Sequence, residues 1–201
     1  MMPWHGRWNA GSESYVRAKG MLIFTERLIL RPWNESDAES LYKVVKDPEV
    51  GPIAGWNPHK NVAESRDVIK NILSGEECYA VCLKSDGVAI GAVELMLHGH
   101  AARTHNDDEC ELGYWIGREF WGRGLIPEAA KALLHRAFHD LAMSTVWCGY
   151  FDGNTKSKRV QEKLGFVYHH TCEADPVPLM NEVRVSHTNY MTQKMWQDMN
   201  M

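Results

Sequence analysis

The segment that most restricts the fold of this chain is Trp121-Gly122-Arg123-Gly124-Leu125-Ile126-Pro127-Glu128. It lies between a strand-like run, Glu111–Gly117, and an amphipathic helix that is predicted from Pro127 to about Leu141. The two glycines allow backbone amides to approach a ligand closely, and Pro127 suits the first helical position because it has no N–H to leave unpaired. Together with the helix dipole, the free amides form a site suited to a pyrophosphate, to which Arg123 adds a positive charge.

A glycine-containing turn between a strand and a helix also occurs without any ligand, so its context matters. The Walker A motif is excluded because no Gly-Lys-Ser or Gly-Lys-Thr is present, and the dinucleotide fingerprint is excluded because Pro127 occupies the place of its third glycine. The elements predicted along the chain are a strand, two helices, three strands, a helix, a strand, a helix and two strands. This order predicts a single α/β or α+β domain with a mixed sheet covered by helices.

Periodicity and turn residues place these elements. The strands are predicted over Leu22–Pro32, Tyr79–Leu83, Val88–Leu97, Glu111–Gly117, Thr145–Phe151, Phe166–Thr171 and Arg184–Met191. Capping boxes at Ser36–Glu39 and Asn61–Glu64 predict two helix starts, and Gly165 ends a short helix over Thr155–Leu164. Residues 1–20 show no periodic pattern and are interpreted as an N-terminal extension, so the predicted domain comprises residues 21–201.

The composition narrows the expected partners. A formal net charge of -4 gives no overall basic field, so a nucleic-acid partner is not expected. The chain has no apolar run of about 18 residues and no signal peptide, which predicts a cytoplasmic protein without a membrane partner. The five cysteines form no Cys-x-x-Cys pair and no histidine spacing resembles a closed zinc site, so no metal is expected. Both a monomer and a homodimer are compatible with the sequence.

The glycine loop resembles motif A of the GNAT superfamily of N-acetyltransferases, whose usual form is Gln/Arg-x-x-Gly-x-Gly/Ala. Aligned on Gly124, Trp121 stands at the Gln/Arg place and Ile126 at the Gly/Ala place. Trp-Gly-Lys/Arg-Gly is frequent in the branch that acetylates the N-termini of ribosomal proteins. Further segments are similar to that branch in the same order, namely Thr25–Arg31, Glu111–Ile116, and Asn154-x-x-Ser157 with Leu164-Gly165-Phe166.

The resemblance implies an acetyl-CoA-dependent enzyme with a GNAT fold, in which helices flank a mixed, mostly antiparallel sheet of about seven strands. The fourth and fifth strands would splay apart and hold the pantetheine arm between them, while the glycine loop binds the pyrophosphate. An amide near Trp115 or Ile116 would donate to the thioester oxygen. The cofactor-binding residues implied are Tyr114, Trp115, Ile116, Trp121, Gly122, Arg123, Gly124, Leu125, Ile126, Asn154, Ser157 and Lys158.

Two residues are candidates for the chemistry. Glu111 begins the strand that the resemblance places beside the acetyl group, so it would take a proton from the amine through water or bind the ammonium. It also fits as an exposed carboxylate at a strand edge. The resemblance implies that Asn154 holds the pantetheine arm and that Ser157 donates a hydrogen bond to the departing sulfur. Both residues also fit a purely structural role at the start of a helix.

The expected reaction is direct attack of a primary amine on the thioester, with the α-amine at a protein or peptide N-terminus as the expected acceptor. An α-amine of pKa about 8 is roughly a tenth neutral at pH 7, whereas a lysine side chain is neutral less than about one time in a thousand. An α-amine therefore needs little help from a general base. Two alternatives stay open: acetylation of a small amine, such as an aminoglycoside, polyamine or amino-acid analogue, and a coenzyme A-binding module without catalysis.

Overall fold

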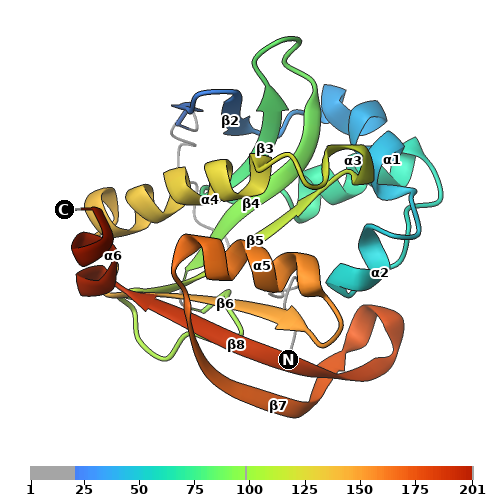
Figure 1. The fold of residues 1–201 in the computed structure, drawn as a ribbon. Coiled ribbons are helices and arrows are strands. Elements are labelled where there is room, and N and C mark those ends of the chain that lie inside the picture. Colours follow the sequence, from blue (N-terminus) through green and yellow to red (C-terminus); the bar gives the residue numbers. More distant parts are fainter. Residues whose placement is uncertain (1–20, 98, 201) are drawn as a thin grey trace.

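The computed structural model describes residues 21–97 and 99–200, so the predicted extension, residues 1–20, lies outside the described part of the chain. The described residues form one eight-stranded sheet in the order β1-β2-β3-β4-β5-β6-β8-β7 (Figure 1). Neighbouring strands are antiparallel except β5 and β6, which are parallel. This confirms the predicted mixed, mostly antiparallel sheet. The strands are β1 (Ile23–Phe24), β2 (Leu28–Pro32), β3 (Cys78–Leu83), β4 (Ala89–Leu97), β5 (Glu109–Ile116), β6 (Thr145–Phe151), β7 (Val167–Val177) and β8 (Glu182–Thr192).

The predicted strand Leu22–Pro32 is two strands, which is why the sheet has eight. β1 and β2 pair antiparallel with Phe24 opposite Ile29, and the backbone N–H of Thr25 donates to the carbonyl of Leu28 at 3.0 Å to close the turn. The prediction of one continuous strand is wrong because apolar residues stand on both sides of this turn and conceal it. The turn projects toward the glycine loop, where its side chains have a role described below.

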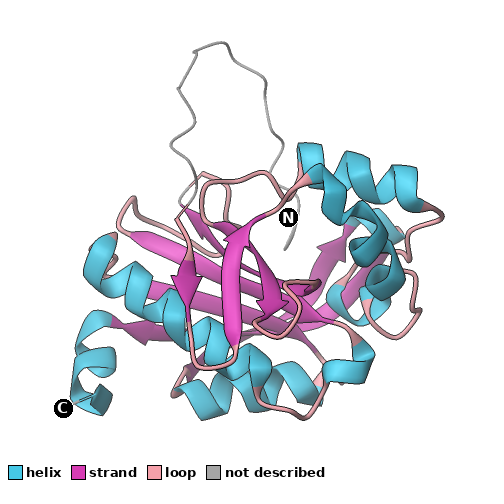
Figure 2. Ribbon diagram, turned by 90° about the horizontal axis from the view of Figure 1, so that it is seen from above, coloured by secondary structure: helices cyan, strands magenta, loops and turns pink. Residues whose placement is uncertain are grey.

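Helices cover both faces of the sheet (Figure 2). The helices α1 (Ala38–Val45), α2 (Gly51–Ala54) and α3 (Val62–Asn71) share one core with residues such as Ala92, whereas α4 (Leu125–His135) and α5 (Thr155–Leu164) share the opposite core with residues such as Val93. Because successive side chains of a strand point to opposite faces, β4 contributes to both cores. The last helix, α6 (Gln193–Asn200), packs Trp196 against Phe138, with ring centroids 5.9 Å apart.

The structure confirms one predicted helix start and moves two others by two residues each. The first capping box is formed by Asn34 and Asp37, so its predicted position at Ser36–Glu39 is wrong by two residues. The Asn34 side chain accepts from the Ser36 backbone N–H at 3.0 Å, and the Asp37 carboxylate accepts from the Asn34 backbone N–H at 2.9 Å. The Asn61 cap of α3 is confirmed. The helix predicted from Pro127 begins two residues earlier, at Leu125, and continues from His135 into a π-helical turn, Arg136–Asp140. Pro127 still falls among the first residues, whose N–H groups have no intrahelical partner.

The parallel pair at the centre of the sheet comes apart. β5 and β6 pair only from Glu109 opposite Thr145 to Glu111 opposite Trp147, although β5 runs on to Ile116 and β6 to Phe151. The predicted splay between the fourth and fifth predicted strands is therefore confirmed. It leaves one backbone edge of β5 without a strand partner over its second half, between α4 and α5 in Figure 1.

Candidate active site

The glycine loop has the backbone conformation that its two glycines allow. Gly122 and Gly124 have φ angles of +75° and +74°, in the left-handed region that other residues rarely adopt, and Gly124 is the N-cap of α4. No side chain caps this helix start in the described structure. The backbone N–H groups at the start of α4 are therefore available to an anion, as the sequence predicts.

The turn between β1 and β2 anchors the loop. The carboxylate of Glu128, in the first turn of α4, accepts hydrogen bonds from the Thr25 hydroxyl and from the backbone and guanidinium N–H groups of Arg27, and Arg27 also donates to the carbonyl of Arg123 at 2.9 Å. Burial raises the pKa of the Glu128 carboxyl, but the hydrogen bonds from Thr25 and Arg27 outweigh this and hold it below its ordinary value. The Thr25–Arg31 segment, which resembles the GNAT family in sequence, therefore holds the glycine loop in place through these hydrogen bonds.

A cavity of about 490 Å³ extends from this loop along the free edge of β5 to the start of α5. Ten of the predicted cofactor-binding residues line it: Tyr114, Trp115, Ile116, Trp121, Gly122, Gly124, Leu125, Ile126, Asn154 and Ser157. The other two do not line it. The guanidinium of Arg123 lies over the ring of Phe120, 5.4 Å from its centroid, and the ammonium of Lys158 is 3.9 Å from Glu162.

Positive charge reaches the cavity from other residues of α5. Lys156, Arg159 and Lys163 line it, and the ammonium of Lys156 lies 4.1 Å from the centroid of the Trp121 ring. Three cations facing a helix N-terminus make this region attractive to phosphate groups. The sequence indicates a basic helix face, but it does not reveal which of its members point inward.

The alternation of backbone groups along β5 shows which amides face the gap. The N–H of Gly117 donates to the carbonyl of Ile90 on the β4 side, at 2.9 Å. Because N–H groups alternate between the two edges of a strand, those of Tyr114 and Ile116 point to the β6 side, into the gap. Of the two amides expected to meet the thioester oxygen, the geometry favours Ile116 over Trp115.

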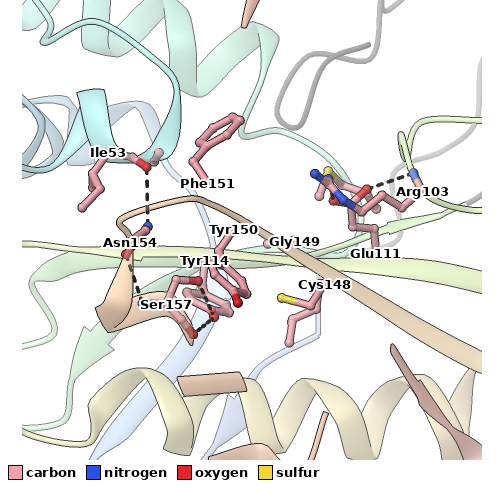
Figure 3. Close-up of a pocket in the computed structure, with 14 residues that line it drawn as sticks. Ile53, Arg103, Glu111, Tyr114, Cys148, Gly149, Tyr150, Phe151, Asn154 and Ser157 are labelled. Carbon is pink, nitrogen blue, oxygen red and sulfur yellow. Dashed lines mark hydrogen bonds and ion pairs between the residues drawn. The ribbon is translucent and has the colours of Figure 1, made fainter. Parts of the chain in front are cut away.

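A smaller cavity of about 60 Å³ lies deeper in the gap, where Ser157 and Tyr114 meet (Figure 3). The Ser157 hydroxyl is 2.9 Å from the Tyr114 hydroxyl, and Tyr114 also donates to the Ser157 carbonyl at 3.2 Å. The side chain of Asn154 accepts from the Ser157 backbone N–H at 3.1 Å, which confirms Asn154 as the helix cap. Ser157 contributes only its backbone N–H to that cap, so the cap does not use its hydroxyl.

Glu111 is buried rather than exposed. Only 2% of its surface is accessible, which makes the alternative of an exposed strand-edge carboxylate wrong. Its carboxylate forms an ion pair with the Arg103 guanidinium and accepts from the backbone N–H groups of Ala102 and Arg103, at 3.1 and 3.3 Å. Figure 3 shows the pair of Arg103 with Glu111. Arg103 also donates to Thr188 at 3.2 Å and lies 3.4 Å from Asp175, so it bridges β5 to β7 and β8.

The sequence interpretation misses Arg103, because nothing in the polar segment before β5 indicates that one of its side chains reaches three strands. It also misses Glu94, although a single carboxylate within the apolar strand β4 is a detectable signal. Glu94 lies opposite Gly113 and two residues from Met96, which lies opposite Glu111, so Glu94 and Glu111 share one face of the sheet. Burial, followed by the charge of Glu111, raises the pKa of Glu94 from 4.5 to about 7.

Glu94→Gln is therefore expected to stabilise the protein at pH 8 and to leave its stability nearly unchanged at pH 4. Below pH 4 both folded and unfolded chains hold the proton. Between 4.5 and about 7 the unfolded chain loses it first, so stability falls as pH rises and stays lower above pH 7. Replacing the carboxyl by an amide should recover on the order of 1–3 kcal/mol at pH 8. Urea unfolding of both proteins at the two pH values measures this, and an equal difference at both would contradict it.

Two features are absent from the described residues, 21–97 and 99–200. No helix there is long and apolar enough to cross a bilayer. In the same ranges, no group of three or more His, Cys, Asp and Glu side chains is arranged to hold a metal ion.

The sequence profile of the acetyltransferase (GNAT) domain matches residues 27–167, well over half of the chain. The chain belongs to the GNAT acetyltransferases. The matched residues include the β1–β2 turn from Arg27 onward, the glycine loop, both splayed strands and α5. The GNAT assignment made from the resemblance is confirmed, and the protein is an acyltransferase by family.

Individual relatives agree with this assignment. This GNAT chain is 29% identical over 149 residues to the uncharacterized N-acetyltransferase p20 of Bacillus licheniformis, a match that covers 72% of the chain and 81% of p20. A stretch of 86 residues is 40% identical to YdaF of Bacillus subtilis, named provisionally as a ribosomal N-acetyltransferase, and covers 41% of the chain and 42% of YdaF. A GNAT-family acetyltransferase from Bacillus anthracis has the same fold, with a TM-score of 0.75 at 20% identity over 87% of this chain and 99% of that one.

Proposed function

We propose that this GNAT protein transfers the acetyl group of acetyl-CoA to the α-amine at the N-terminus of a protein or peptide. The observation that carries the proposal is the continuous cavity from the left-handed glycine loop, along the free edge of β5, to Ser157. The end of the cavity at the glycine loop suits the phosphates of the ligand. The part along β5 suits an extended arm that contains amide groups. The N-terminal α-amine is favoured as acceptor by the similarity to YdaF, whose name refers to ribosomal N-acetylation.

The residues around the gap suit direct attack of the amine on the thioester that acetyl-CoA supplies. As the C–N bond forms, the Ile116 N–H stabilises the negative charge on the carbonyl oxygen. As the C–S bond breaks, the Ser157 hydroxyl stabilises the thiolate, and the proton that the acylated nitrogen releases passes to water or to the thiolate. An acyl-cysteine route is disfavoured, because burial raises the pKa of the Cys148 thiol beside Ser157 and keeps it protonated.

An acceptor panel tests the proposal. Purified protein is incubated with acetyl-CoA and either short peptides with a free N-terminus, the same peptides with a blocked N-terminus and an internal lysine, or the small amines spermidine and kanamycin. Thiol release gives the rate and mass spectrometry gives the acetylated atom. We expect acetylation of the free α-amine; transfer confined to the small amines, or no transfer to any acceptor, would overturn the proposal.

Ser157→Ala is expected to lower kcat by about 10- to 100-fold, the range for losing a hydrogen bond to a charged group. The affinity for acetyl-CoA should change less than about twofold, because the bond strengthens only as charge develops on sulfur. Initial rates at saturating acetyl-CoA, together with calorimetry and a melting curve, separate these effects. A lowered melting temperature with an unaltered kcat would show a structural role alone.

A further inference from the structure

Gln161 is a polar side chain in a place where a helix facing a sheet ordinarily carries an apolar one. It lies one turn after Ser157 on α5, and none of its surface is accessible to solvent. Its Nε2 donates to the Gly149 carbonyl and to the Ser157 hydroxyl, both at 3.2 Å, and its Oε1 accepts from Asn189 Nδ2 at 2.8 Å. These three hydrogen bonds satisfy the buried amide, and one of them connects it to a residue of the candidate site.

The direction of these hydrogen bonds is fixed by the Gly149 carbonyl. A carbonyl oxygen can only accept, so the Gln161 atom that faces it must be the NH2 group, and the same group faces the Ser157 hydroxyl. The Ser157 oxygen is therefore an acceptor toward Gln161. Its own proton must be donated elsewhere, and the remaining directions are Tyr114 and the cavity (Figure 3).

Tyr114 does not need that proton. Burial raises its pKa well above the ordinary value, so the phenol stays protonated, and its one proton faces both the Ser157 hydroxyl at 2.9 Å and the Ser157 carbonyl at 3.2 Å, the hydroxyl being the nearer acceptor. With both Gln161 and Tyr114 arranged as donors, the Ser157 proton can point into the cavity without leaving a buried group unpaired. A hydroxyl that accepts one hydrogen bond is also a stronger donor in another.

We propose that Gln161 is a positioning residue for acetyl transfer: it holds the Ser157 oxygen as an acceptor and thereby directs the Ser157 proton toward the departing sulfur. The chain of donors runs from Asn189 through Gln161 to Ser157. This inference rests on the proposed function, since it requires that Ser157 assist the thiolate. It gives Gln161 on α5 and Asn189 on β8 a role in the reaction, although neither residue lines the cavity.

The test is a double-mutant cycle of Gln161→Met and Ser157→Ala, with kcat and KM for acetyl-CoA measured on the acceptor that the panel identifies. Methionine keeps the length of the side chain but donates nothing. We expect Gln161→Met to lower kcat by about three- to tenfold with KM for acetyl-CoA nearly unchanged, and to have no further effect on kcat when Ser157 is already alanine. Equal losses of kcat in both backgrounds, or no loss in either, would overturn the proposal.

Asn189→Asp provides a second variant if Gln161→Met folds poorly. An aspartate offers Gln161 only acceptors, so it repels Oε1 in the present orientation, while a turned amide would set Oε1 against the Gly149 carbonyl. In either orientation the hydrogen bond that holds the Ser157 oxygen is weakened. The same fall in kcat is expected, again only when Ser157 is present. Glu162→Ala, at an exposed neighbouring position, is the matched control and should leave kcat unchanged.

The outcomes also separate this proposal from the function on which it rests. If Ser157→Ala lowers kcat and both Gln161→Met and Asn189→Asp leave it unchanged, the positioning role fails alone. If Ser157→Ala has no effect on kcat, the role of Ser157 fails and the positioning role with it. If the wild-type protein acetylates no acceptor, the proposed function itself fails.

Discussion

Gly124→Glu is expected to weaken the binding of coenzyme A by at least about 100-fold, because two effects act together. Gly124 has a φ of +74°, so any side chain there strains the N-cap of α4 by about 1–2 kcal/mol. The new carboxylate would also stand at the helix N-terminus, where the pyrophosphate is expected, and repel it. Isothermal titration calorimetry with coenzyme A measures the loss.

Gly87→Glu is the matched control for this substitution. Gly87 lies in the turn between β3 and β4, has a φ of +70° and has no atom within 4 Å of a side chain added there. It should suffer similar backbone strain and bind coenzyme A as the wild type does. Equal affinities for wild type and Gly124→Glu would remove the pyrophosphate from the glycine loop.

Glu111→Gln is expected to destabilise the fold by about 3–5 kcal/mol, the range for breaking a buried ion pair from one side. The Arg103 guanidinium, whose side chain is 11% exposed, would keep only Asp175 at 3.4 Å as a charged partner. A chain of this size should then melt about 10 °C lower, which circular dichroism detects. The double substitution Arg103→Met with Glu111→Leu removes both charges and should recover much of the loss. An unchanged melting temperature for Glu111→Gln would contradict the stabilising role of the pair.

The same variant tests Glu111 as a proton acceptor. If Glu111 assists deprotonation, the rate of Glu111→Gln should fall more at pH 6.5 than at pH 9, since free amine becomes abundant as pH rises. Because its carboxylate oxygens are already engaged by Arg103 and two backbone N–H groups, we expect similar losses at both pH values, measured below the melting transition.

Local signals predicted the parts of the site that depend on local structure. The glycine loop, the Asn154 cap and the strands on either side of the gap each have a signature within a few residues, and their order was enough to predict the GNAT fold. The sequence leaves Glu111 open between a carboxylate of the site and an exposed one at a strand edge, because acidic residues precede it. Its burial depends on the pairing of β5 with β6 and on a guanidinium from another segment, and neither leaves a trace near Glu111 in the sequence.

The sequence does not indicate the burial of Gln161, for a related reason. On a helix rich in charge it looks like one more solvated polar residue, although its spacing of four from Ser157 places the two side chains on one face. Its burial follows from the way α5 lies over β6 and β8, where Gly149 and Asn189 supply its partners. Periodicity does not reveal contacts between residues far apart in the sequence. In the structure these contacts show that Gln161 lies beside the site and not on the surface.

Because β5 and β6 pair only in part, the folded protein has an open sheet edge to which an extended ligand can bind. Over the second half of β5 the Ile116 carbonyl accepts from the Trp121 indole at 3.0 Å, and the other hydrogen bonds that would complete the sheet must come from water or from a bound ligand. A ligand that supplies them binds only the folded chain, and at a hundred times its dissociation constant it adds about 2.7 kcal/mol to stability. If coenzyme A is that ligand, as the proposed function requires, the resistance of this protein to heat and to proteases should rise with the concentration of coenzyme A.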